Sequence, residues 1–106
     1  DRPLRESQTE TDPELQAVLD VLQDSDCRCI MQAVDEHPLT VAELTDACDL
    51  PRTTAYRKVD RLVEASLLET QTRIRTRGHH ALQYAPVVSA VTVSIDADGT
   101  VELALS

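Results

Sequence analysis

The chain has 106 residues, which is enough for one domain built around a single modest hydrophobic core. It is strongly acidic, with 19 Asp and Glu against 10 Lys and Arg and a formal net charge of −9. No apolar run approaches the roughly 20 residues of a membrane span and the polar N-terminal stretch has no signal-peptide pattern, so the sequence favours a cytoplasmic protein.

The N-terminal part begins with a polar stretch and continues with two predicted helices. Residues 1–11 have no apolar periodicity, which predicts a disordered tail, and Asp12-Pro13 then supplies a helix N-cap and a first-turn proline. The first helix has an apolar stripe at i, i+3, i+4 and i+7: Leu15, Val18, Leu19 and Leu22. The second helix is capped by Asp24 or Ser25 and ends at His37-Pro38, because a residue before proline is biased away from helical angles. Its apolar stripe is Cys27, Ile30, Met31 and Val34.

A short helix, a tight turn and a longer helix come next. Thr40 and Glu43 form a capping box, in which the hydroxyl and the carboxylate can each satisfy a free backbone N–H. The short helix covers 41–48, with Leu44, Ala47 and Cys48 facing inward. After the turn at 49–51, the longer helix runs from about Arg52 to Ala65. Its predicted buried face is Ala55, Val59, Leu62 and Val63. This order predicts a helix-turn-helix.

Two β-hairpins complete the chain. Leu68, Thr70, Thr72 and Ile74 alternate with Glu69, Gln71, Arg73 and Arg75, which is strand periodicity. Gly78 marks a turn, and 81–85 returns as the partner strand. The second hairpin has one apolar face: Val91, Val93, Ile95, Val101, Leu103 and Leu105. The predicted fold is α+β: a winged helix-turn-helix of three to four helices and a β-wing over 12–89, with an added C-terminal β-hairpin over 90–106, a candidate dimerisation element.

Positive charge is concentrated in one segment of this acidic chain. Seven of the ten Lys and Arg lie between Arg52 and Arg77, against three acids, so this segment is basic while the remainder is strongly acidic. DNA binding requires cations only on the docking face, so local segregation matters more than the net charge. The segment coincides with the longer helix and the wing.

Residues 39–68 resemble winged helix-turn-helix transcriptional regulators of the ArsR-like type, in particular small haloarchaeal ones. Four runs carry the resemblance: Leu39–Leu44, Cys48–Pro51, Thr53–Leu62 and Glu64–Leu68. The resemblance extends over roughly 13–85, and 90–106 is similar to an extension of haloarchaeal members. Many relatives have Ser in place of Pro51 and Gly in place of Ser66, so the caps of the longer helix differ here. The resemblance implies sequence-specific binding of double-stranded DNA and control of transcription.

The longer helix is then the recognition helix, with Thr53 and Arg57 opposite its core face and directed into the major groove. The wing arginines at i, i+2 and i+4 would lie along the DNA backbone or in a minor groove. The predicted DNA-binding residues are Arg52, Thr53, Thr54, Tyr56, Arg57, Lys58, Arg61, Arg73, Arg75, Arg77, His79 and His80. For the longer helix, the alternative to DNA contact is a solvated face with charge pairs within the helix. For the wing, the alternative is a hairpin that its charges keep soluble. The alternative to DNA binding is that the chain is a winged-helix protein–protein interaction module that binds an acidic partner.

The three cysteines raise the question of a metal or redox site. Cys27 and Cys29 are about 200° apart on a helix, so they do not readily share one ion. Cys27 and Cys48 fall on predicted core faces, where a free Cys is a small hydrophobe. The odd number and the cytoplasmic setting argue against structural disulfides. We therefore predict no metal and no cofactor. The chain also has no nucleophile–base triad and no Gly-rich phosphate loop, so we expect no enzyme activity.

Lys58 is the only lysine beside nine arginines. An acid excess with almost no lysine is typical of proteins adapted to high internal salt, as in haloarchaea, although an ordinary acidic domain is the alternative. We expect salt cations to accompany the acidic surface. We also expect a homodimer, joined through the apolar surfaces of the helix over 13–23 and the hairpin 90–106.

Overall fold

A computed structural model describes residues 13–75, 78 and 80–106. The predicted tail 1–11, the predicted N-cap Asp12 and the predicted site residues Arg77 and His79 lie outside this part. The elements that it contains are α2 (Pro13–Leu22), α3 (Ser25–Ala33), β1 (Leu39–Thr40), α4 (Val41–Cys48), α5 (Arg52–Glu64), β2 (Leu68–Arg73), β3 (Ala81–Pro86), β4 (Val91–Ile95) and β5 (Val101–Leu105). The α+β class, the helix-turn-helix of α4 and α5, and both hairpins are confirmed.

Local side-chain chemistry sets where the helices begin. The Asp24 carboxylate accepts a hydrogen bond from the Asp26 N–H at 2.9 Å and caps α3. The predicted capping box is present on α4: the Thr40 hydroxyl accepts from the Glu43 N–H at 3.2 Å, and the Glu43 carboxylate accepts from the Thr40 N–H at 2.9 Å. Helix α3 ends at Ala33, earlier than the predicted end at His37-Pro38.

Helix α5 ends in a Schellman motif. Ser66 has a φ of 65°, and the Leu67 N–H bonds the Leu62 carbonyl at 3.0 Å. A left-handed residue at this position favours glycine, so the serine is the less suited residue. The turn before α5 contains a second left-handed residue, Asp49, with a φ of 54°.

The wing belongs to a three-stranded antiparallel sheet of order β1-β3-β2. Its hairpin pairs Leu68 with Pro86 and Arg73 with Ala81. Strand β1 was not predicted, because it has only two residues; it pairs Leu39 with Tyr84 and joins the helix-turn-helix to the wing. The predicted first wing strand is shorter than expected and ends at Arg73.

The second hairpin is a separate two-stranded sheet. Its register sets apolar residues directly opposite one another: Val91 with Leu105, Val93 with Leu103, and Ile95 with Val101. The predicted single apolar face is therefore confirmed. Leu103 is 2 % exposed and belongs to the core cluster, whereas Ile95 is 71 % exposed. One end of this face thus joins the core and the other end is open.

In the described part of the chain, helices α2, α3, α4 and α5 form the core together with Leu39, Leu67, Leu68, Tyr84 and Leu103. Two predicted core positions are wrong, since Leu19 is 37 % exposed and Ala47 is exposed. In both helices the buried face lies at a different angle around the helix axis than predicted. The buried face of α2 is centred on Val18, so Val21 lies inward and Leu19 outward. The buried face of α4 is centred between Val41 and Leu44.

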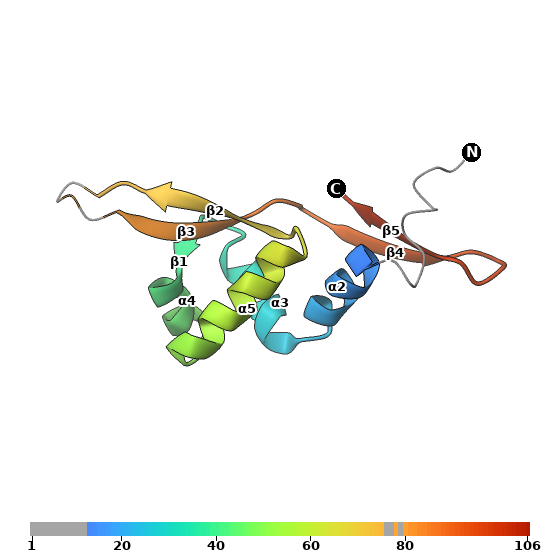
Figure 1. Cartoon of the computed structure of the whole chain (residues 1–106), viewed down its shortest axis with the longest axis horizontal. Coiled ribbons are helices and arrows are strands. Elements are labelled where there is room, and N and C mark those ends of the chain that lie inside the picture. The colour runs from blue at the N-terminus through green and yellow to red at the C-terminus, as the bar shows by residue number, and fades with distance from the viewer. Residues whose placement is uncertain (1–12, 76–77, 79) are drawn as a thin grey trace.

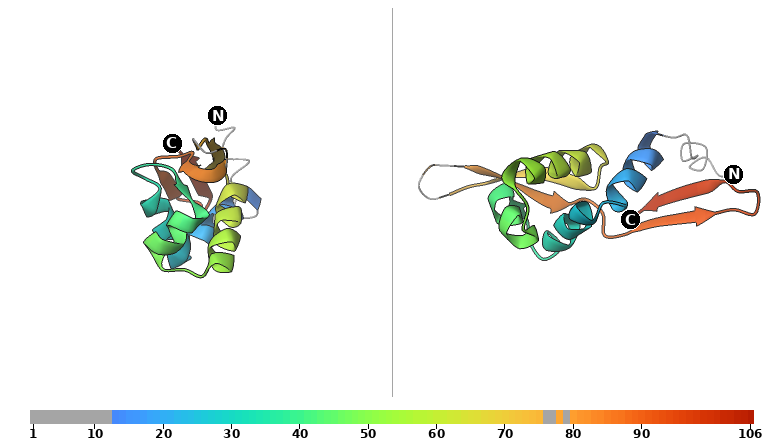
Figure 2. Two further views of the ribbon diagram at one scale, coloured as in Figure 1. Left: turned by 90° about the vertical axis from the view of Figure 1, so that its left-hand side faces the viewer. Right: turned by 90° about the horizontal axis from the view of Figure 1, so that it is seen from below.

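The two hairpins project from opposite ends of the molecule (Figure 1). The helices lie together on one side of the strands, as the end-on view shows (Figure 2, left). The radius of gyration is 15.8 Å, compared with about 13 Å for a compact domain of this length, and the longest extent is 56 Å. None of the helices in the described ranges is both long and apolar enough to span a bilayer.

Candidate nucleic-acid interface

Helix α5 has one buried face and one polar, exposed face. Ala55, Val59 and Leu62 are fully buried and fix its orientation. Thr53 and Arg57 are exposed on the opposite side, as predicted from the helical spacing. Asp60 and Glu64 lie exposed further along the helix. The N-terminal half of α5 is therefore the basic half, and Thr54 beside it is half-buried.

A cation–aromatic contact stands at the start of α5. The Arg52 guanidinium carbon lies 5.9 Å from the centre of the Tyr56 ring, one turn further along the helix. Tyr56 is 46 % exposed. The contact directs the arginine side chain across the ring and keeps both groups at the surface.

An open cavity of about 320 Å³ lies between the N-termini of α4 and α5 and the wing. Arg52 and Tyr56 line it from α5, and Arg75 lines it from the first arm of the wing. Both arginines are exposed. The remaining lining residues are Thr40, Val41, Ala42, Ala81, Leu82 and Tyr84. The helix-turn-helix and the wing thus bring two cations to one concave surface.

Lys58 and Arg61 face the N-terminus of α3. The Lys58 ammonium forms a hydrogen-bonded ion pair with Asp24 and lies 3.8 Å from Asp26, and its side chain is 11 % exposed. Arg61 lies 3.7 Å from the same Asp24 carboxylate. The hydrogen bond from Lys58 lowers the pKa of Asp24, although burial opposes this shift. Two of the predicted DNA-binding cations are therefore paired with acids inside the chain.

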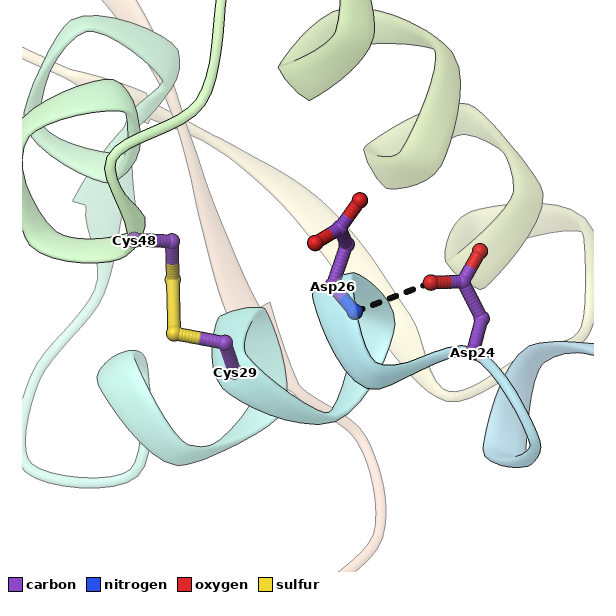
Figure 3. The surroundings of a disulfide bond; sticks show 4 residues. All are labelled: Asp24, Asp26, Cys29 and Cys48. Carbon is purple, nitrogen blue, oxygen red and sulfur yellow. Dashed lines mark hydrogen bonds between the residues drawn. A yellow bond between two sulfur atoms is a disulfide. The ribbon is translucent and has the colours of Figure 1, made fainter.

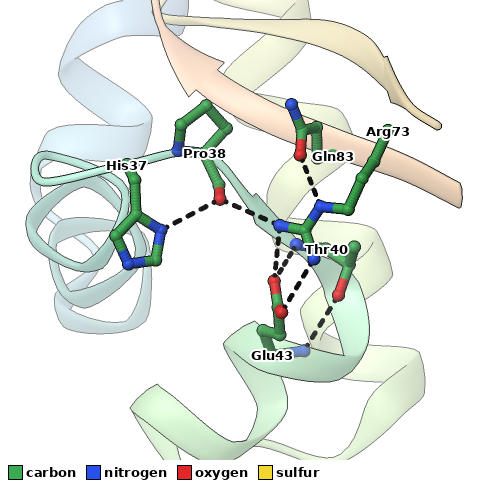
Figure 4. Close-up of polar contacts among 6 residues, drawn as sticks. All are labelled: His37, Pro38, Thr40, Glu43, Arg73 and Gln83. Atoms are coloured by element: carbon green, nitrogen blue, oxygen red, sulfur yellow. Dashed lines mark hydrogen bonds and ion pairs between the residues drawn. The ribbon is translucent and has the colours of Figure 1, made fainter. Parts of the chain in front are cut away.

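Arg73 is also committed to partners within the chain (Figure 4). Its guanidinium donates to both oxygens of Glu43, at 2.9 and 3.0 Å, to the Pro38 carbonyl at 3.1 Å, and to the Gln83 side chain at 2.7 Å. The hydrogen bonds from Arg73 are the main reason why the pKa of Glu43 falls from 4.5 to about 2, and the Thr40 N–H adds to the shift. Arg73 therefore joins the base of the wing to α4.

The rest of the wing is exposed. Arg75 follows the end of β2, and His80 precedes β3. Two apolar side chains flank them at the surface, Ile74 at 79 % exposure and Leu82 at 55 %. Of the predicted DNA-binding residues of the wing that the structure describes, Arg75 and His80 are exposed, whereas Arg73 is half-buried.

Cys29 and Cys48 form a disulfide, with their Cα atoms 6.0 Å apart (Figure 3). The prediction that the chain has no structural disulfide is therefore wrong. Cys27 and Cys29 lie on different sides of α3, as predicted: Cys27 is buried in the core, whereas Cys29 is half-buried and meets the end of α4. Cys48 is half-buried and packs against the core at the last residue of α4, but there it also meets Cys29.

The third cysteine differs from this pair. Cys27 is a free thiol, is 1 % exposed, and has its pKa raised chiefly by burial. Within residues 13–75, 78 and 80–106, no three His, Cys, Asp or Glu side chains are grouped so as to hold a metal ion.

The comparison with known families identifies the central part of the chain. A family described as a helix-turn-helix domain matches residues 17–71, slightly more than half of the chain, from α2 into β2. The match contains α4, the turn and α5 in full. No curated protein matches the chain.

Proposed function

The chain belongs to the helix-turn-helix domain family, and we propose that it is a transcriptional regulator that binds double-stranded DNA in a sequence-specific manner. Helix α5 would enter the major groove and the wing would lie on the backbone or in a minor groove. The ArsR-like type and the salt-adapted, haloarchaeal character belong to the same proposal. They are supported by the motif runs and by the single lysine beside nine arginines.

The observation that carries the proposal is the cavity shared by Arg52 and Arg75. One arginine comes from the recognition helix and the other from the wing, and both are exposed. A guanidinium binds phosphate oxygens with two parallel hydrogen bonds. A DNA phosphate between these two side chains would fix the register of α5 in the groove, and the Tyr56 hydroxyl could add a third donor.

We propose three different roles for the predicted DNA-binding residues. Thr53 and Arg57 would contact base edges, since they are exposed on the outward side of α5, and the half-buried Thr54 would do so from beside this side. Arg52, Tyr56, Arg75, Arg77, His79 and His80 would contact the backbone. Lys58, Arg61 and Arg73 would instead hold α5 and the wing in place, because each lies against a carboxylate of the chain.

We also propose a homodimer that assembles in the cytoplasm, with 12–89 as the DNA-binding unit and 90–106 as the dimerisation element. A two-stranded hairpin is marginally stable alone in water, and the distal part of the β4–β5 face is apolar and open. Leu19 adds exposed apolar surface on α2. Salt cations would be retained on the acidic remainder of the surface.

Selection from a pool of random duplexes, followed by fluorescence anisotropy on the selected and a scrambled duplex, tests the proposal. We expect enrichment of a short motif and at least about 10³-fold tighter binding to it. Equal binding to all duplexes would reduce the function to non-specific DNA binding. If no duplex binds while an acidic protein does, the rival interaction-module function is correct.

A further inference from the structure

The Cys29–Cys48 disulfide lies directly before the turn of the helix-turn-helix. Cys48 is the last residue of α4, and the turn 49–51 leads straight into α5. Asp49 takes the left-handed conformation, and the Leu50 N–H bonds back to the Thr45 carbonyl at 3.1 Å. The N-cap of α5, Pro51, forms no side-chain capping bond, so the bridge is a covalent anchor close to the start of the recognition helix.

The disulfide is accessible, whereas the third cysteine is not. Both bridged residues are half-buried, and an open cavity of about 350 Å³ is lined by Cys29, Gln32, Ala33, Glu36 and Ala47. A small thiol could therefore reach the bridge from solvent. The buried Cys27 thiol has a raised pKa, so it is poorly ionised and does not compete as a nucleophile.

We propose that Cys29 and Cys48 form a reversible thiol–disulfide exchange site for small thiols, and that the disulfide form holds the turn and the start of α5 in the DNA-binding arrangement. The DNA part of this inference rests on the proposed function. The site itself rests on the bridge, its position beside the turn, and its access from the open cavity. Disulfides that solvent can reach undergo exchange more readily than fully buried ones.

The exchange is balanced by two thiol molecules. A thiolate attacks one sulfur of the bridge, the Cys29–Cys48 bond breaks, and a mixed disulfide and one protein thiolate form. A second thiolate attacks the mixed disulfide, which releases a small-molecule disulfide and the second protein thiolate. The two protein thiolates take up protons from solvent. Two electrons pass to the protein, and the reverse sequence with a small disulfide restores the bridge.

Reduction should loosen the turn without unfolding the domain. The core contacts of α3 and α4 through Ile30 and Leu44 remain, so the helices stay packed. Removing a cross-link between residues 19 apart in sequence should lower the melting temperature by about 10 °C or more. Affinity for the selected duplex should fall about tenfold, within the usual range for coupling between two sites.

The experiment uses the full chain in oxidised form and after treatment with a small monothiol at millimolar concentration. Thiol alkylation with mass spectrometry assigns each cysteine, anisotropy at fixed salt gives duplex affinity, and hydrogen exchange monitors residues 45–56. Cys29→Ser and Cys48→Ser should match the reduced wild type under both conditions. Cys27→Ser is the matched control and should respond like wild type.

Each outcome decides a separate point. If Cys29 and Cys48 stay protected from alkylation in the presence of thiol, or if Cys29→Ser still responds, the exchange site is wrong. If the oxidised and the reduced protein bind the duplex with equal affinity, the proposal that the disulfide controls DNA binding is wrong. If no duplex binds in either form, the proposed function fails. In that case, faster hydrogen exchange of the turn after reduction would still support the thiol–disulfide exchange site. An unchanged rate of hydrogen exchange would overturn the proposed site.

Discussion

The guanidinium of Arg73 in β2 forms two hydrogen bonds, of 2.9 and 3.0 Å, with the carboxylate of Glu43 in α4. The same carboxylate caps α4 through the Thr40 N–H, and the same guanidinium reaches the Pro38 carbonyl and Gln83. One ion pair therefore links the wing, the strand β1 segment and the first helix of the helix-turn-helix. It restrains the base of the wing against α4.

The first prediction contrasts two wing arginines that are two residues apart. Arg73→Gln should lower the melting temperature by a few degrees, because Glu43 loses its main partner. Arg75→Gln should leave the melting temperature unchanged. It should weaken binding to all duplexes alike and reduce the salt slope by about one, as expected for a phosphate contact. Calorimetry and anisotropy on both variants would check this, and the opposite assignment of the two effects would contradict it.

The second prediction concerns pH. Folding lowers the pKa of Glu43 to about 2 from 4.5, so its contribution to the free energy of unfolding is complete above 4.5. It is lost as the pH falls from 4.5 through about 2. Glu43→Gln lacks this contribution, so the advantage of wild type over the variant should shrink across that window. Urea midpoints from about pH 6 down to about pH 2 measure it. The exposed Glu36→Gln is the control, and a constant difference for Glu43→Gln would contradict the assignment.

The third prediction concerns base readout by Arg57. Arg57→Ala should cost about 1–3 kcal/mol on the selected duplex and relax the preference at one base position. We expect this effect because Arg57 is exposed on α5, on the side opposite the buried Val59. Arg28→Ala removes the same charge from α3, where the guanidinium donates to the Leu22 carbonyl, and should have little effect. Equal weakening on selected and scrambled duplexes would show that Arg57 contacts phosphate.

The fourth prediction separates assembly from folding in the hairpin. Ile95→Asp should give a folded monomer, since its side chain is 71 % exposed on the open end of the apolar face. Leu103→Asp should destabilise the fold by about 3 kcal/mol or more, because it places a carboxylate in the core. Light scattering and calorimetry distinguish the two results. Thr92→Asp, on the other face, is the control, and a dimer that survives Ile95→Asp would favour α2 as the interface.

The fifth prediction concerns salt. Ordinary DNA-binding domains release counterions, so their affinity falls steeply as salt rises. Here Asp60 and Glu64 lie exposed on α5 itself, and the remainder of the chain is strongly acidic. At molar salt the Debye length is about 3 Å, so repulsion between these acids and DNA is screened. We expect a shallow or reversed salt slope in KCl, measured only where circular dichroism shows a folded protein. A steep ordinary loss would contradict the salt-adapted mechanism.

Local patterns were sufficient to predict most of the fold. The capping box at Thr40 and Glu43 and the buried face of α5 depend on residues close in sequence, and they were predicted correctly. The alternation over 91–95 and 101–105 predicted the shared apolar face of the second hairpin in the same way. Such features follow from spacing alone.

Apart from the two helix-face errors at Leu19 and Ala47, the errors occur where distant elements meet. Strand β1 forms only because β3 offers an edge beside Leu39, and two residues give no periodicity. The disulfide needs the end of α4 to lie against α3. The roles of Lys58 and Arg73 depend on Asp24 and Glu43, which are 34 and 30 residues away. Strand alternation indicated which side of the wing Arg73 occupies, but it could not show what lies against that side.

The opposite projection of the wing and the β4–β5 hairpin also bears on the length of the operator. A two-fold dimer joined through the hairpin faces would have its two recognition helices on either side of the joint. Each protomer extends 56 Å, whereas one turn of B-DNA spans about 34 Å. Such a dimer would favour inverted half-sites separated by more than one turn, with an unprotected stretch between two footprints.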